Sequence, residues 1–204
     1  MGGTMSAKGS TAPSPGSDTP TRILDTAEAL VQQRGFNSFS YGEVAGELGI
    51  TRASLHYHYP GKAILGRSLI ERYAERFGEE LARIDAGEPG PAEKLRAYVA
   101  LYSGVLSEGR MCLCGMLAAE FLTLPEELRD PLLRFFDDNE AWLAAVLEEG
   151  RSDGAMQFAG PAGETARMLI GGLEGAMLIA RPYGDTERFR RAAAGLLSGL
   201  AMDA

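Results

Sequence analysis

Apolar residues recur at intervals of three and four along most of the chain, and no convincing stretch alternates between apolar and polar positions. This spacing is typical of amphipathic α-helices, so we predict an all-α protein. The first predicted helix begins at Thr19-Pro20, a cap followed by proline, and ends at Gly35. Its apolar stripe consists of Ile23, Ala27, Leu30 and Val31.

Two short helices joined by a glycine turn are predicted within residues 40–62. Ser40 caps the first of them, and Glu43, three residues later, completes an S-x-x-E capping box. Gly49 supplies the positive φ that a sharp turn needs. Thr51 caps the second helix, whose inner face consists of Ile50, Leu55 and Tyr59. This layout is that of a DNA-reading helix-turn-helix.

The second of these helices begins without an acidic residue. Its first turn is Thr51-Arg52-Ala53-Ser54, so its free N–H groups, its dipole and the arginine attract anions. The small alanine and serine allow close approach to a groove. His56, Tyr57 and His58 follow, and their polar tips can donate hydrogen bonds to phosphate. The two histidines diverge on a helix, which favours DNA-facing or solvated positions over a metal pair.

The run GITRASLHYHYPGK, residues 49–62, resembles the TetR/AcrR family of bacterial transcriptional regulators, and Gly35-Phe36 and the SYGEVA segment at 40–45 fit the same pattern. The resemblance is specific over about residues 21–70 and architectural beyond them. Three features depart from the family: His56 replaces the usual tyrosine, Tyr59 replaces phenylalanine, and Pro60-Gly61 replaces a more polar pair.

The resemblance implies that the second helix lies in the major groove of DNA. It places Arg52, Ala53 and Ser54 at base-reading positions, His56 and His58 against phosphates, and Lys62 as a clamp on the DNA backbone. The complete set of predicted DNA contacts is Ser40, Tyr41, Thr51, Arg52, Ala53, Ser54, His56, Tyr57, His58 and Lys62.

The chain length of 204 residues suits one DNA-binding module and one larger domain. We predict a disordered Gly/Ser/Thr/Pro-rich tail at 1–19, a helix-turn-helix domain at 20–66, and an effector-binding and dimerisation domain at 67–204. No apolar run of about 18 residues or signal peptide is recognisable, so we expect a cytoplasmic protein without a membrane partner.

The net charge of −8 is unusual for a protein that binds DNA, but it is unevenly distributed. Residues 20–76 carry seven basic and six acidic side chains, whereas residues 77–204 carry 12 basic and 21 acidic ones. A locally basic tip on an acidic body is compatible with DNA binding, and the body discourages non-specific association.

Six further helices are predicted after Pro60, which gives about nine in all. A long helix from Lys62 to about Asp85 connects the two domains. The others are expected on the stripe Leu95 to Val105, at 111–122, at 125–150, at 162–180 and at 185–200.

Small residues on the last two predicted helices indicate close helix packing, because each glycine inside a helix costs about 1 kcal/mol relative to alanine. The resemblance implies a four-helix interface between two subunits, which we favour over packing against the helix at 125–150. The predicted dimer interface is Gly171, Gly172, Gly175, Ala176, Ala192, Gly195, Ser198 and Gly199.

The family builds its effector pocket among the C-terminal helices, where aromatic residues at helical spacing fit either a core or a cavity wall. The candidate pocket residues are Tyr98, Tyr102, Cys112, Met116, Glu120, Phe121, Phe135, Asn139, Trp142 and Arg167. No strongly cationic cluster is present, so a highly anionic effector is not favoured. Cys112 and Cys114 are interpreted as small buried residues, with a redox-sensing thiol and a copper(I) site as alternatives.

These patterns favour a DNA-binding transcriptional regulator, by family default a repressor, that binds a palindromic operator as a homodimer and is released by a small molecule. The alternatives are a thiol-based sensor that uses Cys112 or Cys114, and a helical binding protein without DNA recognition. No phosphate loop, carboxylate pair or Cys/His/Asp set indicates an enzyme, a cofactor or a metal site.

Overall fold

The computed structural model describes residues 18–200, and within them the chain forms nine α-helices, three short 3-10 helices and no strand. The all-α prediction is confirmed. The predicted disordered tail falls almost wholly on residues 1–17, outside the described part of the chain. Its last residue, Thr19, is already helical, and Asp18 rather than Thr19 caps the first helix by accepting a hydrogen bond from the Thr21 N–H at 3.2 Å.

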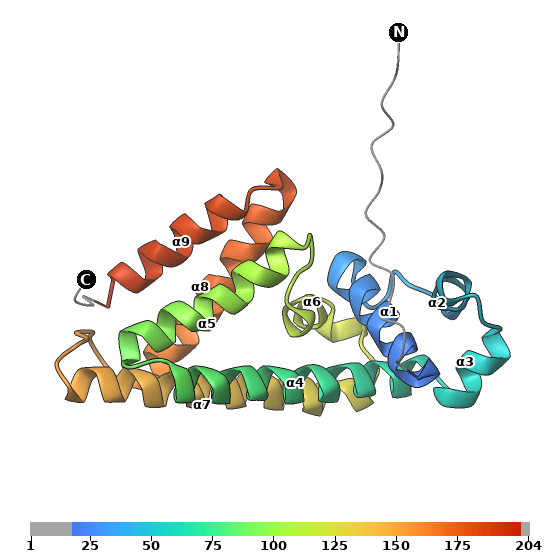
Figure 1. The fold of residues 1–204 in the computed structure, drawn as a ribbon, viewed down its shortest axis with the longest axis horizontal. Helices are drawn as coiled ribbons and strands as arrows, with labels where there is room; N and C mark the ends of the chain where they lie inside the picture. Colours follow the sequence, from blue (N-terminus) through green and yellow to red (C-terminus); the bar gives the residue numbers. More distant parts are fainter. Residues whose placement is uncertain (1–17, 201–204) are drawn as a thin grey trace, which may run out of the picture.

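Helices α1 (Thr19–Arg34), α2 (Tyr41–Leu48) and α3 (Arg52–His58) form a small domain at one end of the molecule (Figure 1). We call residues 18–61 the helix-turn-helix domain. Its core contains Phe36, Phe39 and Leu55, each less than 5 % exposed. Helix α4 (Lys62–Gly87) then leaves this domain and runs along the rest of the molecule.

The remaining helices form the body, residues 88–200: α5 (Pro91–Ser107), α6 (Leu113–Ala119), α7 (Arg129–Ser152), α8 (Ala162–Ala180) and α9 (Thr186–Ser198). Helix α7 packs on α8, and α8 packs on α9. The helix predicted at 111–122 is shorter, because it stops at Ala119 and a 3-10 turn, Phe121–Thr123, follows. The helix predicted from Pro125 begins at Arg129 after a second 3-10 turn, Glu126–Leu128.

The helix-turn-helix domain is attached to the body through the end of α1. Glu28 of α1 is buried and forms ion pairs with Arg72 (2.9 Å) and Arg76 (2.5 Å) of α4. The guanidinium of Arg181 donates to the Gln33 carbonyl, and the Met111 N–H donates to the Gln32 carbonyl at 3.2 Å. These bonds hold α1 against α4, against the 3-10 turn Arg181–Tyr183 after α8, and against the loop before α6.

Within residues 18–200, no helix is both long enough and apolar enough to span a bilayer.

Candidate nucleic-acid interface and ligand cavity

Local hydrogen bonds fix the geometry of α2, the turn and α3. The Ser40 side chain accepts from the Glu43 N–H at 3.3 Å while the Glu43 carboxylate accepts from the Ser40 N–H at 2.8 Å, so the predicted capping box is present. Gly49 has φ 66° and ψ 29°, the left-handed conformation expected of the turn. The Thr51 hydroxyl caps α3 by accepting from the Ser54 N–H at 3.1 Å.

The first turn of α3 projects from the molecule and contains no acidic residue. Thr51, Arg52 and Ala53 are exposed, and Ser54 is half-buried. On the same helix Tyr57 is 83 % exposed, an unusual position for so large a ring. The helix therefore offers an uncovered positive end flanked by small residues and an aromatic side chain, which suits contact with a polyanion.

The two histidines of α3 differ in their surroundings. The ring of His56 packs on Tyr41 with 4.7 Å between the centroids, whereas His58 is half-buried beside Tyr57. Tyr41 is anchored because its hydroxyl donates to the Tyr59 carbonyl at 3.0 Å, and burial raises the pKa of Tyr41 to about 12. Tyr41 thus holds α2 against the end of α3, and His56 remains exposed.

Lys62 does not project toward solvent as a free clamp for the DNA backbone. Its ammonium donates to the Phe39 carbonyl at 2.7 Å and lies over the rings of Phe36 and Phe39, 4.8 Å and 4.3 Å from their centroids. Burial lowers the pKa of Lys62. In this structure the side chain ties α4 to the loop between α1 and α2, so its first role is structural.

Glu120 lies in the joint between domain and body, not in a pocket. Its carboxylate accepts from the Phe36 N–H at 2.6 Å and from the Asn37 N–H at 3.3 Å. Both N–H groups follow the C-terminal end of α1. The side chain from the end of α6 therefore binds the helix-turn-helix domain, and the predicted role in orienting a ligand does not fit this position.

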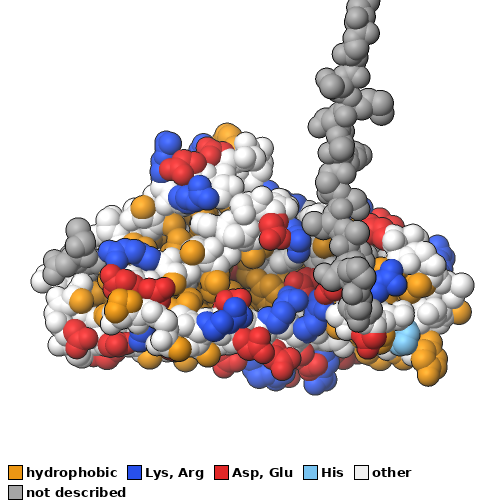
Figure 2. All heavy atoms as spheres, viewed as in Figure 1, with side chains coloured by type: hydrophobic (Ala, Val, Ile, Leu, Met, Phe, Trp, Pro, Cys, Tyr) orange, Lys and Arg blue, Asp and Glu red, His pale blue; other side chains and the backbone are white. Residues whose placement is uncertain are grey.

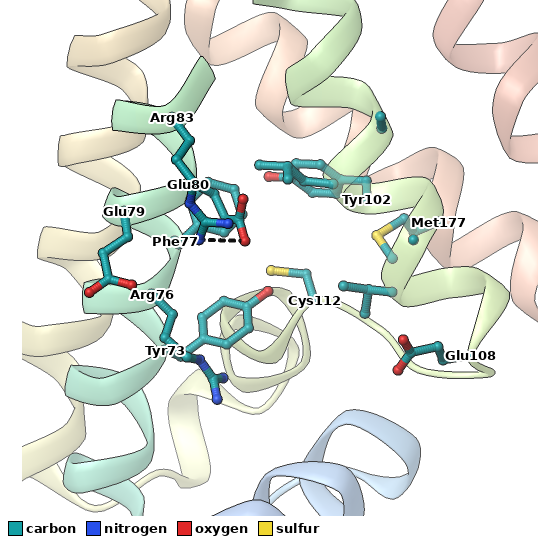
Figure 3. A pocket seen from close by; sticks show the side chains of 14 residues that line it. Tyr73, Arg76, Phe77, Glu79, Glu80, Arg83, Tyr102, Glu108, Cys112 and Met177 are labelled. Carbon is teal, nitrogen blue, oxygen red and sulfur yellow. Dashed lines mark ion pairs between the residues drawn. The ribbon is translucent and has the colours of Figure 1, made fainter. Parts of the chain in front are cut away.

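A cavity of about 460 Å³ lies between α4, α5, α8 and the loop before α6. Figure 3 shows Tyr73 and Phe77 of α4, Tyr102 of α5, Cys112 and Met177 around it, with the Tyr73 hydroxyl and the Cys112 thiol pointing toward one another. Its volume lies in the range of small-molecule sites. Charged residues, among them Arg76, Glu79, Glu80, Arg83 and Glu108, surround the opening.

Of the ten candidate pocket residues, Tyr102 and Cys112 line this cavity. Four others form a layer behind it: Tyr98, Phe135 and Asn139, which are buried, and Trp142, which is half-buried. Tyr98 stacks on Trp142 with 5.5 Å between centroids, and its hydroxyl donates to the Asn139 side-chain oxygen at 3.2 Å. Asn139 in turn donates to the Phe135 carbonyl at 2.7 Å. These polar groups bond to one another, so the layer supports the wall of the cavity.

The remaining candidates lie away from the cavity. Arg167 is exposed on α8 and forms an ion pair with Glu140 at 3.0 Å. Phe121 packs under the guanidinium of Arg129, and the Met116 sulfur accepts from Arg181 at 3.5 Å. Sequence spacing could not separate these positions from the cavity wall, because the wall is assembled from four separate segments.

Both cysteines are free and buried. Cys112 caps α6, its sulfur accepting from the Gly115 N–H at 3.4 Å, and also contacts the buried carboxyl of Glu174. Burial and then the neighbouring Glu174 raise the pKa of the Cys112 thiol well above its usual value. Burial and Cys112 do the same for Cys114. At neutral pH both are therefore thiols and poor nucleophiles.

The predicted dimer residues divide into two groups. A Cβ added to Gly172 would lie 2.7 Å from the Leu196 side chain, so this glycine serves packing between α8 and α9 of one chain. Gly171, Gly175 and Gly195 face open space instead. Met168, Leu178 and Ile179 are more than half exposed on α8. Ala192 and Ser198 of α9 and Gly199 directly after it are exposed, and Ala176 of α8 is half-buried.

Sequence reasoning missed the contribution of α4 and α8 to the cavity. Tyr73 and Phe77 lie on the long helix that begins at Lys62, which the sequence predicted as a connection between the two domains. Glu174 carried a usable signal, because it is the only charged residue in the segment Met168–Ala180, MLIGGLEGAMLIA. Burying a single carboxyl group on an apolar helix costs free energy unless a hydrogen-bond donor or a positive charge pairs with it.

The described residues contain no group of three or more His, Cys, Asp or Glu side chains placed to hold a metal ion.

The fold and the exposed α3 define a helix-turn-helix protein with a separate cavity-containing body, the arrangement of a DNA-binding transcription regulator. Residues 23–67 match the family "Bacterial regulatory proteins, tetR family", and residues 91–196 match "Tetracyclin repressor-like, C-terminal domain". The chain belongs to the TetR family of transcriptional regulators.

Individual relatives agree with this assignment. The chain is similar to the HTH-type transcriptional repressor NemR of Escherichia coli K12, 26% identical over 159 residues that cover 74% of this chain and 78% of the relative. A TetR-family regulator from Agrobacterium tumefaciens superposes with a TM-score of 0.86 at 32% identity, covering 91% of this chain and 97% of that one. One from Legionella pneumophila gives 0.80 at 32% identity, covering 92% and 100%.

Proposed function

We propose that this protein is a cytoplasmic repressor that binds a palindromic operator as a homodimer and releases it when a small molecule occupies the cavity. The observation that carries the proposal is the first turn of α3, which is exposed, lacks acidic residues and is held rigidly by Thr51 and Gly49. Arg52, Ala53 and Ser54 then face base edges, and His56 and Tyr57 face phosphates.

A second copy is needed because one seven-residue helix buries too little surface for tight binding. The uncovered apolar positions Met168, Leu178 and Ile179, with Gly171, Gly175 and Gly195 beside them, supply a face for that copy. Two recognition helices about 34–36 Å apart would then enter successive major grooves.

Helix α4 connects the cavity to the DNA-reading surface. Arg76 lies at the cavity opening and also holds Glu28 of α1 at 2.5 Å. A ligand that moves this part of α4 therefore acts on the helix-turn-helix domain. By linkage, effector and operator weaken each other's binding by the same factor. The thiol-sensor alternative has no comparable support, because both thiols are buried and their pKa values are raised.

Selection of duplexes from a random DNA pool tests this function. We expect an inverted repeat, with an affinity that falls steeply as salt rises. Arg52→Ala should weaken binding to that duplex about ten-fold or more without changing thermal stability, since the side chain is exposed. Arg167→Ala, which removes an exposed arginine of the body, is the matched control. Failure to enrich any sequence, or equal effects of both variants, would contradict the proposal.

A further inference from the structure

Glu174 places a carboxyl group in an apolar setting with too few partners. Its Oε1 atom is buried and accepts no hydrogen bond. The Cys112 thiol is a hydrogen-bond partner of the same carboxyl, and burial raises the pKa of Glu174 to about 7. The carboxylate also packs against Gly115, where the absence of a side chain makes room for it. A buried acid of this kind calls for a positively charged or hydrogen-donating partner.

Cys112 joins this carboxyl to the cavity, because its side chain lines the cavity and touches Glu174 on its other side. Met177, one turn further along α8, lines the same cavity. Glu174 itself does not line the cavity, so a ligand would reach its unpartnered oxygen through a change in the Cys112 side-chain rotamer. In Figure 3 the Cys112 thiol lies between the Tyr73 ring and the Tyr102 ring.

The other walls also suit a positive charge. The aromatic rings of Tyr73, Phe77 and Tyr102 line the cavity, and their faces attract cations. At the opening, Arg83 is paired with Glu80 at 2.8 Å and Arg76 with Glu28 at 2.5 Å, so both guanidinium groups already have carboxylate partners. Glu79 adds negative charge, whereas Glu108 is paired with Arg110 at 2.8 Å.

We infer that the cavity binds a small organic cation with an apolar or aromatic body, and that Glu174 is the residue that selects its charge. The inference rests on the proposed function only in treating the occupant as the effector. The positive group pairs with the Glu174 carboxylate, and the body of the ligand lies against Tyr73, Phe77 and Tyr102.

Charge selectivity in the DNA-free protein tests the inference. The probes are benzyltrimethylammonium, its neutral analogue neopentylbenzene, and the anion phenylacetate. Binding is followed by the fluorescence of Trp142, the only tryptophan, and by the shift in thermal midpoint. We expect the cation to bind at least ten-fold more tightly than either of the other compounds. Equal or weaker binding of the cation, or binding of none of the three, would overturn the inference.

Two variants assign the selectivity to one residue. Glu174→Gln keeps the shape and removes the charge, so it should weaken cation binding about ten-fold and change neopentylbenzene binding less than two-fold. Glu164→Gln, an exposed position on the same helix, should leave both unchanged. Cation binding unaffected by Glu174→Gln would refute the assignment. Operator binding is measured separately, without ligand. If the protein binds DNA but no cation, only this inference is contradicted. If it binds the cation but no DNA, only the proposal of a transcriptional regulator is contradicted.

Discussion

The helix-turn-helix domain and the region of the cavity differ in whether their polar groups have hydrogen-bond partners within the protein. In the domain, Ser40, Glu43 and Thr51 form hydrogen bonds that cap the N-terminal ends of α2 and α3, each between residues three apart in the sequence. The proposed DNA-reading surface of α3 faces solvent. In the body, Glu174 is half-buried, and its carboxyl oxygen Oε1 is buried without a hydrogen-bond partner. A surface that must present one fixed shape to DNA benefits from complete local bonding. A cavity that must respond to a ligand benefits from a group whose partner arrives from outside.

The largest expected effect concerns the cost of burying Glu174. Its pKa is about 7 in the folded protein and about 4.5 in the unfolded chain, so the folded state holds the proton more tightly. Below the unfolded value both states are protonated, and the burial costs nothing extra. As pH rises from about 4.5 to about 7, the free energy of unfolding falls by about 3 kcal/mol, and above the folded value the loss is complete.

Glu174→Gln has no such proton to lose. Its free energy of unfolding should therefore exceed that of the natural protein by up to about 3 kcal/mol at pH 8 and by almost nothing near pH 4.5. Urea denaturation at several pH values measures this difference. A pH-independent difference between the two proteins would contradict the account of an unsatisfied acid.

The local bonds of the helix-turn-helix domain are also the part of the molecule that the sequence predicts well. Capping boxes, a left-handed glycine and an N-cap threonine act over three or four residues, so Ser40, Gly49 and Thr51 could be assigned without knowing the fold. The cavity is formed by α4, α5, α8 and a loop. The spacing of Tyr98 and Phe135 in the sequence does not show whether they line the cavity or pack behind the residues that do. The hydrogen bonds of Glu120 and Lys62 could not be predicted from spacing for the same reason, since their partners are 84 and 23 residues away.

The second prediction concerns Lys62. It tests whether the stability of the helix-turn-helix domain also depends on a hydrogen bond between residues far apart in the sequence. Lys62→Ala leaves the Phe39 carbonyl without its donor and removes the ammonium from two aromatic rings. We expect a loss of about 2 kcal/mol in the free energy of unfolding. Lys62→Met retains the apolar stem and should lose less.

Thermal unfolding of both variants, with DNA affinity measured on the folded protein, separates structure from recognition. An unchanged unfolding free energy together with a shallower salt dependence of DNA binding would mean that Lys62 contacts phosphate directly after all.

The smallest expected effect concerns the junction between the two regions. A Cβ added to Gly66 of α4 would lie 2.7 Å from both Leu128 of the body and Phe36 of the helix-turn-helix domain. Gly66→Ala should therefore destabilise the protein by about 1–2 kcal/mol through overpacking. Gly78→Ala on the same helix meets no atom within 4 Å and should stabilise it by up to about 1 kcal/mol. Calorimetry measures the change in unfolding temperature of both variants. Equal changes for Gly66→Ala and Gly78→Ala would show that the junction is not tightly packed.

The central claim is that two exposed α3 helices enter the major groove of one operator. Methylation interference on a selected duplex measures this most directly, because guanine N7 lies in the major groove. The account predicts two clusters of interfering guanines, centred 10–10.5 base pairs apart or a multiple of that spacing, with two protein chains bound per duplex. A single cluster, or one chain per duplex, would contradict it.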